Sequence, residues 1–543
     1  MNTRSVRNAL AGAATVVALA SGSAPVARAQ VLAQPRADSL IEAGNLAAHD
    51  SRHRDAIALY ERAIQLDSAR RTSLLPRLGR QYLWSDEPSQ AARLFTEYLA
   101  VHPASCETKL DLGLAQSWAD QLDQARATYD AVAGACLYER GQARLGAARV
   151  LRWTNKHSAA ERRYHAVMAD GNDSDREQAA IGLAYVHLAR AEPRAALTLA
   201  DSLERVGSRD PSLAEAKAMA QADLGALGTA VATARTARAE GRGSASLDRL
   251  AESYRERARA SFSAGARGFR DRDGTEYRAA DVASAAAPLG FGAIRVTARA
   301  TELRKEAVIL GSREAEASFD SRLARWLAVS ARGGIRSYDA TDFTPWEGEV
   351  NLAVLPGDHH RLDFTAARIM LGDNVAAIQQ ELEGTFLSAG ITERLTSNFA
   401  VAISGDVTDW STDNRRTRFR VTPRVTFETV PAVTLEWPTA YQRYDEAFAF
   451  QLFSPREYVE TGPALNVSRR VARVWWVSAY GKAGGLRESG RDWQALGIVR
   501  GSVEREIRSH WGIRFDAGWS NSNLAGSAGF QRTTAGVSLT IRP

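Results

Sequence analysis

The side-chain pattern of this chain changes its period once, within residues 241–258, and this change constrains the fold more than any other feature. Before it, about 220 residues carry apolar side chains every three to four positions, as amphipathic helices do. After it, about 280 residues alternate apolar and polar side chains in segments separated by Gly, Asp, Ser and Asn. Such segments are typical of a transmembrane β-barrel, a closed sheet that pairs every backbone N–H and C=O. The sequence therefore predicts helices followed by a membrane-embedded barrel.

The first 29 residues have the three parts of a secretory signal peptide. Arg4 and Arg7 supply the positive start, residues 9–20 form a short apolar stretch, and residues 27–29 read Ala-Arg-Ala, an A-x-A cleavage site. The apolar stretch is too short to cross a bilayer as a helix. We therefore expect an exported chain. Removing the three arginines of this leader lowers the formal net charge from +6 to +3, which argues against nucleic acid as a partner.

Glycines recur through the helical half at intervals of 33 to 36 residues, close to the period of tetratricopeptide repeats. An alanine and then a large apolar residue follow each glycine at nearly constant spacing, with slightly longer turns in the last two units. Small residues let two helices approach closely, and the aromatic residue fills the gap toward the neighbouring repeat. Residues 37–240 thus resemble the tetratricopeptide family, which is typical of protein-binding solenoids. The glycines, each with its alanine and large residue, are Gly44 (Ala56, Tyr60), Gly79 (Ala91, Phe95), Gly113 (Ala125, Tyr129), Gly146 (Ala160, Tyr164) and Gly182 (Ala195, Leu199).

The chain has two cysteines, and both lie in the third repeat. Cys106 begins the first helix of that repeat and Cys136 ends the second. These ends are adjacent in an antiparallel helix pair, so the two residues could meet disulfide geometry in an oxidising compartment. We therefore predict a Cys106–Cys136 disulfide. The alternative is two separately buried thiols that act as small apolar groups.

About sixteen alternating segments follow residue 258, as a barrel with strands of about ten residues requires. In one of them Trp511, Ile513 and Phe515 face one way, while Arg514 and Asp516 face the other. A soluble β-sandwich would also alternate, but the number of segments and the leader favour the barrel. Outer-membrane strands usually finish on an aromatic residue, whereas this chain ends Ile-Arg-Pro. The expected parts are a signal peptide (1–29), a periplasmic repeat domain (30–240), a linker helix (241–258) and the barrel (259–543).

Four arginines share one face of a predicted strand, and its other face is apolar. Because arginine costs a few kcal/mol at the bilayer midplane, these side chains should face the lumen. One interpretation is a basic stripe that guides an anionic or strongly hydrated solute. The other is an ordinary wall in which the arginines pair with acidic residues such as Glu381 and Glu383. The charged stretch 302–314 is open to the same two interpretations. The four residues of the stripe are Arg416, Arg418, Arg420 and Arg424.

Motifs of enzymes are missing from the sequence, which has no HExxH, CxxC, P-loop or GxSxG pattern. His359 and His360 follow Asp358 beside Pro-Gly, which is typical of a polar hairpin turn, and His510 directly precedes a strand. We predict no catalytic residue, no metal site and no cofactor.

The order of signal peptide, repeat array and barrel resembles the exopolysaccharide export porins of Gram-negative bacteria, which serve poly-N-acetylglucosamine and cellulose secretion. Stand-alone outer-membrane barrels of the YaiO type are similar in their strand pattern. The resemblance implies a location in the outer membrane with the repeats in the periplasm. It also implies that the array docks periplasmic proteins or the emerging polymer, and that the barrel exports a polysaccharide. Two alternatives stay open: a non-conducting anchored scaffold for protein–protein interactions, and a barrel enzyme that acts on lipid or glycan.

Overall fold

The computed structural model describes residues 36–288, 292–429, 431–447, 454–471, 474–507, 510–522 and 531–543. The predicted signal peptide, residues 1–29, lies outside the described residues. The chain divides into two compact units, one that ends at Glu87 and one that runs from Pro88 to Pro543. No helix among the described residues is long and apolar enough to cross a membrane.

The first unit holds the first repeat and half of the second. In the first repeat, the ring of Tyr60 packs on Gly44, and a Cβ added to Gly44 would lie 2.7 Å from that ring. The hydroxyl of Tyr60 donates to Asn45 on the same helix as the glycine, at 2.8 Å. The elements of this unit are α1 (Ala37–His49), α2 (His53–Leu66), a 3-10 turn (Ser68–Arg70) and α3 (Arg71–Trp84).

The second unit begins with ten helices that continue the repeat pattern. Tyr129 lies between Gly113 of its own repeat and Gly146 of the next, and an added Cβ at either glycine would come within 2.8 Å of its ring. Tyr129 therefore fills the gap toward the neighbouring repeat, as expected from the sequence, and it does so by packing on the glycines of both repeats. The helices are α4 (Pro88–Val101), α5 (Cys106–Trp118), α6 (Leu122–Ala135), α7 (Arg140–Trp153), α8 (His157–Asp170), α9 (Asp173–Ala189), α10 (Pro193–Arg205), α11 (Pro211–Asp223), α12 (Leu227–Ala239) and α13 (Ala245–Ala258).

The last of these helices, α13, packs as part of the solenoid. Leu247, Ala251 and Tyr254 are buried in one apolar cluster with residues of α11 and α12. Ser244 caps the helix by accepting a hydrogen bond from the backbone N–H of Leu247. The segment expected to link the two domains thus closes the apolar end of the helical stack, and the first strand follows it within three residues.

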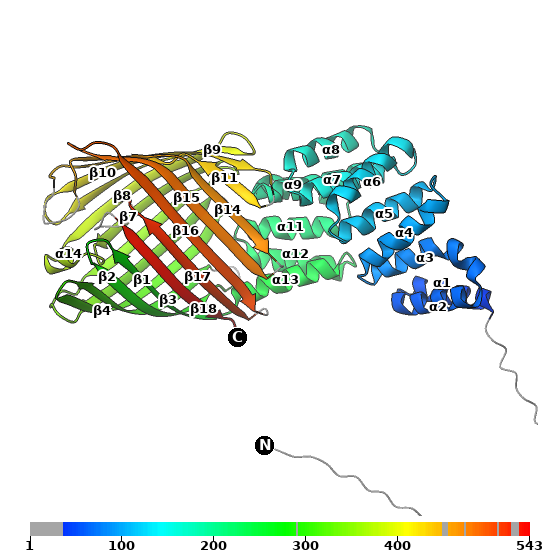
Figure 1. Ribbon diagram of the computed structural model, residues 1–543, viewed down its shortest axis with the longest axis horizontal. Coiled ribbons are helices and arrows are strands. Elements are labelled where there is room, and N and C mark those ends of the chain that lie inside the picture. The colour runs from blue at the N-terminus through cyan, green and yellow to red at the C-terminus, as the bar shows by residue number, and fades with distance from the viewer. Residues whose placement is uncertain are drawn as a thin grey trace, which may run out of the picture. The chain divides into compact units, whose positions relative to one another are not determined.

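The strands form one antiparallel sheet that closes on itself, because β1 pairs with both β2 and β18 (Figure 1). The strands are β1 (Ser261–Asp271), β2 (Glu276–Ala286), β3 (Ala293–Lys305), β4 (Val308–Ala324), β5 (Leu327–Tyr338), β6 (Trp346–Val354), β7 (His360–Met370), β8 (Glu383–Arg394), β9 (Phe399–Trp410), β10 (Arg415–Phe427), β11 (Ala432–Glu436), β12 (Thr439–Tyr444), β13 (Glu457–Thr461), β14 (Ala464–Val471), β15 (Trp475–Glu488), β16 (Gln494–Ile507), β17 (Trp511–Ser520) and β18 (Arg532–Ile541).

Two positions in the wall are divided between pairs of short strands. β11 and β12 both pair with β10, and β13 and β14 both pair with β15. The interruptions fall at Pro438 and Pro463, which lack the N–H that a ladder needs. Counted this way, the described strands make a closed barrel of sixteen, which confirms the predicted architecture.

The outer surface of the barrel is apolar over most of the length of its strands. Large side chains at alternate strand positions stay exposed, among them Val282 (59%), Val499 (59%) and Phe515 (50%). The intervening positions carry arginine, aspartate, serine and tyrosine that point into the lumen. An exposed apolar surface of this extent marks a contact with a membrane or with other proteins.

Candidate conduit through the barrel

Three arginines of the predicted stripe converge on one carboxylate inside the barrel. β10 pairs with β9 so that Arg418 stands directly opposite Asp406. The Oδ2 of Asp406 lies 2.9 Å from Nε of Arg418 and 2.9 Å from a terminal nitrogen of Arg420, and its Oδ1 lies 3.4 Å from Arg416. The side chain of Asp406 is only 1% exposed. One carboxylate opposed to three guanidinium groups leaves this part of the wall positively charged.

The fourth arginine, Arg424, lies further along β10, opposite Ala400 on β9 and Glu436 on β11. The acidic partners suggested from the sequence were wrong. Glu383 pairs with Arg368 instead, and Glu381 lies in the turn before β8 with a φ of 51°. Sequence reasoning missed Asp406 because only the strand register places it beside the stripe.

A second ion-pair network lies on the wall formed by β3 to β6. Glu314, with a side chain 5% exposed, accepts hydrogen bonds at 2.9 Å from both Arg299 and Arg336. Arg336 also lies 3.5 Å from Glu347. These charges belong to the stretch 302–314 and its neighbours, and paired charges of this kind stiffen a wall while keeping it polar.

The wall on the other side of β3 from this network contains a polar cavity of about 670 Å³. Strands β1, β2 and β14 to β18 contribute its lining, which combines aromatic, basic, acidic and hydroxyl-bearing side chains. Aromatic rings with polar handles and charged groups suit a hydrated, polar ligand. The principal side chains are Arg267, Asp281, Trp476, Tyr480, Arg500, Arg514 and Asp516.

A buried ion pair crosses between two strands of the same wall. Nζ of Lys482 lies 2.9 Å from Glu460, and both side chains are under 7% exposed. The hydroxyls of Tyr458 and Ser522 also donate to Glu460. Because a buried charge is costly unless its hydrogen bonds are satisfied, this set should be rigid.

The loop between β7 and β8 folds into the mouth of the barrel at the end away from the helices of this unit (Figure 1). It carries a short helix, α14 (Val375–Gln379), whose N-terminus is capped by Asn374. Ile378 is fully buried and Leu382 is 2% exposed. Two apolar clusters hold the loop against different walls, one with Leu303 and Leu310 and one with Trp410 and Tyr444. We call residues 371–382 the mouth loop.

An ion-pair relay ties the mouth loop to the closing seam of the barrel. Arg532 on β18 lies 2.8 Å from Asp373 of the loop and 2.8 Å from Asp271 on β1. The same guanidinium group stacks on the ring of Phe269, with the guanidinium carbon of Arg532 3.6 Å from the ring centroid. Sequence reasoning missed this loop. The available signal was the apolar run Val-Ala-Ala-Ile behind Asp-Asn, in a segment too apolar for an exposed turn.

At the opposite end of the barrel, helices of the same unit dock on the strand turns. The first backbone N–H groups of α10, at Arg194 and Ala195, donate to the carboxylate of Asp358 at 3.0 Å. At the start of α8, the N–H and hydroxyl of Ser158 donate to Glu428. Helix N-termini attract negative charge, so each barrel carboxylate caps a repeat helix.

Glu192, just before α10, joins these contacts. His187 lies 2.8 Å from its carboxylate, Arg394 at the end of β8 lies 3.8 Å away, and His359 lies 4.0 Å away. Burial opposes ionisation of Glu192, but the hydrogen bond from His187 and the surrounding positive charges hold the pKa of Glu192 below its ordinary value.

Of the histidines considered in the sequence, His359 lies in the turn before β7, His360 is the first residue of β7, and His510 lies in the turn before β17. His359 approaches Glu192, and His360 lies 2.8 Å from Glu393. The absence of a catalytic role for them stays a prediction.

Cys106 and Cys136 are joined in the structure, with sulfur atoms 1.98 Å apart and Cα atoms 5.9 Å apart. Among the described residues, one group of three potential metal ligands occurs, and it consists of this pair and Glu139. Disulfide sulfurs are not thiolates, so the group is a poor candidate for a metal.

Comparisons with known proteins find similarity in architecture only. No protein-family model matches the chain, and no curated protein matches it. Among solved structures, a bacterial polysaccharide outer membrane secretin is similar over 53% of this chain and 99% of its own, with 13% identity and a TM-score of 0.44. A tetratricopeptide repeat protein from Parabacteroides merdae covers 40% of this chain and 89% of its own, with 15% identity and a TM-score of 0.32. CdiB from Acinetobacter baumannii covers 52% of this chain and 60% of its own, with 10% identity and a TM-score of 0.34.

Proposed function

We propose that this protein is an outer-membrane barrel that exports a polysaccharide or a similar hydrated solute. Its repeat domain would lie in the periplasm and dock protein partners or the polymer itself. The observation that carries the proposal is the contrast between the two faces of the closed barrel. Its outside is apolar, whereas its inside carries the Asp406–arginine cluster and a polar cavity with aromatic side chains. A wall of this kind favours water and polar groups inside and hydrocarbon outside.

The charge of the wall supports a solute with anionic groups. Three arginines surround the single carboxylate of Asp406, and the polar cavity adds three more arginines against Asp281 and Asp516. Aromatic side chains such as Trp476 offer flat faces on which sugar rings could stack. We therefore propose an acidic or strongly hydrated glycan as the preferred cargo.

The position of the mouth loop suggests that the lumen is narrow when the loop is packed in place. Ile378 and Leu382 lie in apolar clusters with residues from several strands, so the loop occupies lumen that a long polymer would need. Export then requires the loop to move, and the docked helices α8 and α10 are positioned to transmit binding of a partner to the barrel.

Conductance in planar bilayers tests the proposal. The full chain should give small or infrequent channel openings. A variant in which a Gly-Ser linker replaces residues 373–381 should give large, stable openings, because the linker cannot fill the lumen. If neither protein conducts although both are folded and inserted, the export function is wrong.

The packed mouth loop also favours the second candidate, a non-conducting scaffold anchored by its barrel. In that case the variant with the Gly-Ser linker would conduct ions, but cells that lack this protein would export polysaccharide as well as cells that have it. The enzyme alternative would require activity on lipid or glycan that is lost in His359→Ala or His360→Ala.

A further inference from the structure

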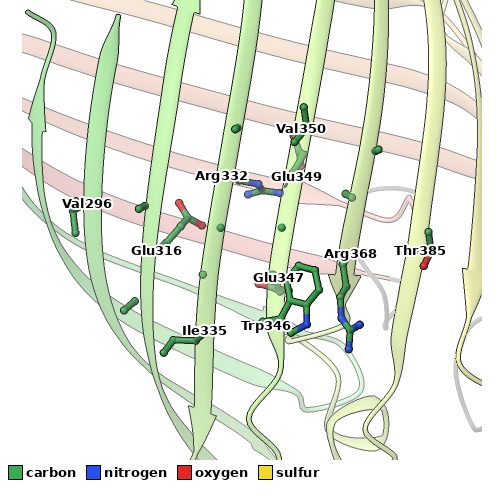
Figure 2. A pocket seen from close by; sticks show the side chains of 18 of the residues that line it. Val296, Glu316, Arg332, Ile335, Trp346, Glu347, Glu349, Val350, Arg368 and Thr385 are labelled. Carbon is green, nitrogen blue, oxygen red and sulfur yellow. Dashed lines mark hydrogen bonds and ion pairs between the residues drawn. The ribbon is translucent and has the colours of Figure 1, made fainter.

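An apolar groove of about 990 Å³ runs along the outside of the barrel across strands β4 to β7 (Figure 2). Its floor consists of outward-facing alanines and glycines, and larger apolar side chains form its two edges. The floor residues are Ala315, Ala317, Ala331, Gly333, Gly348 and Ala366.

The groove lies in the half of the wall near the mouth loop. Trp346 begins β6 at that end, and the neighbouring Ile335 of β5 stands opposite it in the ladder. Both side chains are more than half exposed and edge the groove. Gly333 has room for a side chain, because an added Cβ would meet only the carbonyl oxygen of Glu347, at 3.9 Å. The hollow is therefore a property of the residues present and not a constraint of the backbone.

Positive charge lies at the end of the groove that faces the mouth loop. Arg368 stacks on Trp346, with its guanidinium carbon 4.7 Å from the ring centroid, and the two side chains stand side by side on adjacent strands (Figure 2). Arg313 is exposed on the outer face of β4, two residues from Ala315 and thus about 7 Å further toward the same end. Glu383 pairs with Arg368, while Arg313 forms no ion pair with any described residue.

We propose that the groove binds an acyl chain of a phosphate-bearing membrane lipid, whose phosphate contacts Arg313 and Arg368. The proposal rests on the membrane location proposed above but not on export. Bilayer hydrocarbon must fill any hollow in a surface that faces it, and a floor without side chains lets a chain lie flat against the wall. Two guanidinium groups beside one carboxylate leave a net positive charge for the phosphate, and guanidinium is well suited to pair with it. An indole at the polar end is typical of the membrane interface.

Native mass spectrometry of the full chain with added dioleoylphosphatidylglycerol tests this site. Dioleoylglycerol, which has the same chains and no phosphate, is the comparison lipid. We expect one retained phosphatidylglycerol per wild-type chain, loss of that lipid in the double variant Ala317→Leu/Gly333→Leu, and reduced retention in Arg313→Gln. Ala389→Leu, which also faces outward but lies outside the groove, should retain the lipid as the wild type does.

Equal retention in the double variant and the wild type would overturn the proposal, as would equal retention of the two lipids. A wild-type dimer that dissociates in the double variant would assign the groove to a second copy of the chain and would also overturn it. Heat-modifiable gel mobility checks that each variant is folded. Because conductance can be measured on the same variants, loss of lipid binding with unchanged channels separates this proposal from the export function.

Discussion

The hydroxyl and the backbone N–H of Ser158 both donate to the carboxylate of Glu428, at 2.9 Å and 3.1 Å. Ser158 lies in the first turn of the repeat helix α8, and Glu428 lies in a turn of the barrel, 270 positions later in the chain. The carboxylate of Asp358 likewise accepts hydrogen bonds from the first backbone N–H groups of α10. The repeats next to the barrel are thus fixed to its turns by charge-assisted hydrogen bonds and not by an apolar surface alone.

Glu428→Gln should loosen this attachment. Loss of an anionic cap costs about 1–2 kcal/mol. Hydrogen exchange at the start of α8 should therefore become roughly tenfold faster, since each 1.4 kcal/mol of local opening changes exchange by that factor. Asp413→Asn, in a turn at the other end of the barrel, is the matched control. Unchanged exchange in Glu428→Gln would mean that the cap does not stabilise the helix.

Asp406→Asn should increase the preference of the open conduit for anions, because three guanidinium groups would lose their shared counter-charge. Arg420→Gln should shift the preference in the opposite direction. The measurement is the reversal potential in a KCl gradient, made in the variant that has the linker in place of residues 373–381. Asp406→Asn should also lower thermal stability, since breaking a buried ion pair costs about 3–5 kcal/mol. If Asp406→Asn and Arg420→Gln gave the same reversal potential, the cluster would not influence the ions that pass through the barrel.

Arg532→Gln should free the mouth loop. The substitution leaves Asp373 and Asp271 facing each other without the cation between them, so the loop loses its tie to β1 and β18. Channel openings in planar bilayers should become more frequent than in the wild type. Arg270→Gln, which changes an exposed outward-facing arginine near the same mouth, should leave them unchanged. If both variants open equally often, the relay does not hold the loop.

Acid should weaken the docking of α10 through Glu192. The pKa of Glu192 is lower in the folded protein than its ordinary value of 4.5, so its ionised form stabilises the fold. That contribution is complete above about pH 4.5 and is lost as the pH falls through the lower, folded pKa. Proteolysis at the α9–α10 turn, followed against pH, should therefore rise in acid. Glu192→Gln should be more susceptible at neutral pH and should lack this component of the pH dependence.

Reduction of the Cys106–Cys136 disulfide should destabilise the third repeat. The bond spans 30 residues, and closing a loop of that length removes about 3–4 kcal/mol of chain entropy from the unfolded state. The helical circular dichroism signal of the full chain should melt at a lower temperature with reducing agent. The double variant Cys106→Ser/Cys136→Ser should melt at that lower temperature with or without the agent. An unchanged melting temperature on reduction would argue for two independent thiols.

Much of the architecture follows from residue spacing. The contact of Tyr129 with the neighbouring repeat, at Gly146, was predictable because both residues recur with the repeat, and the outward position of Phe515 followed from alternation. The partner of Arg418 was not predictable. The alternation within one strand shows which side chains share a face, but the residue opposite Arg418 depends on how β9 and β10 are aligned, and one strand alone does not reveal that alignment. The mouth loop was missed for a related reason: a turn that folds inward differs from one that folds outward only in the surface it meets.

The paired interruptions at Pro438 and Pro463 have a mechanical consequence. The ladder places Glu436 opposite Ala464 and Thr439 opposite Thr461, so the two breaks face each other at one level of the wall. The ladder between these two wall positions is interrupted at that level, although Trp437 still donates to Pro423 on β10 and Ala483 on β15 still donates to Pro463. The closing pair of β1 and β18 is uninterrupted. We therefore expect the wall to bend most easily at this level, where the girth of the barrel can change without opening the cylinder.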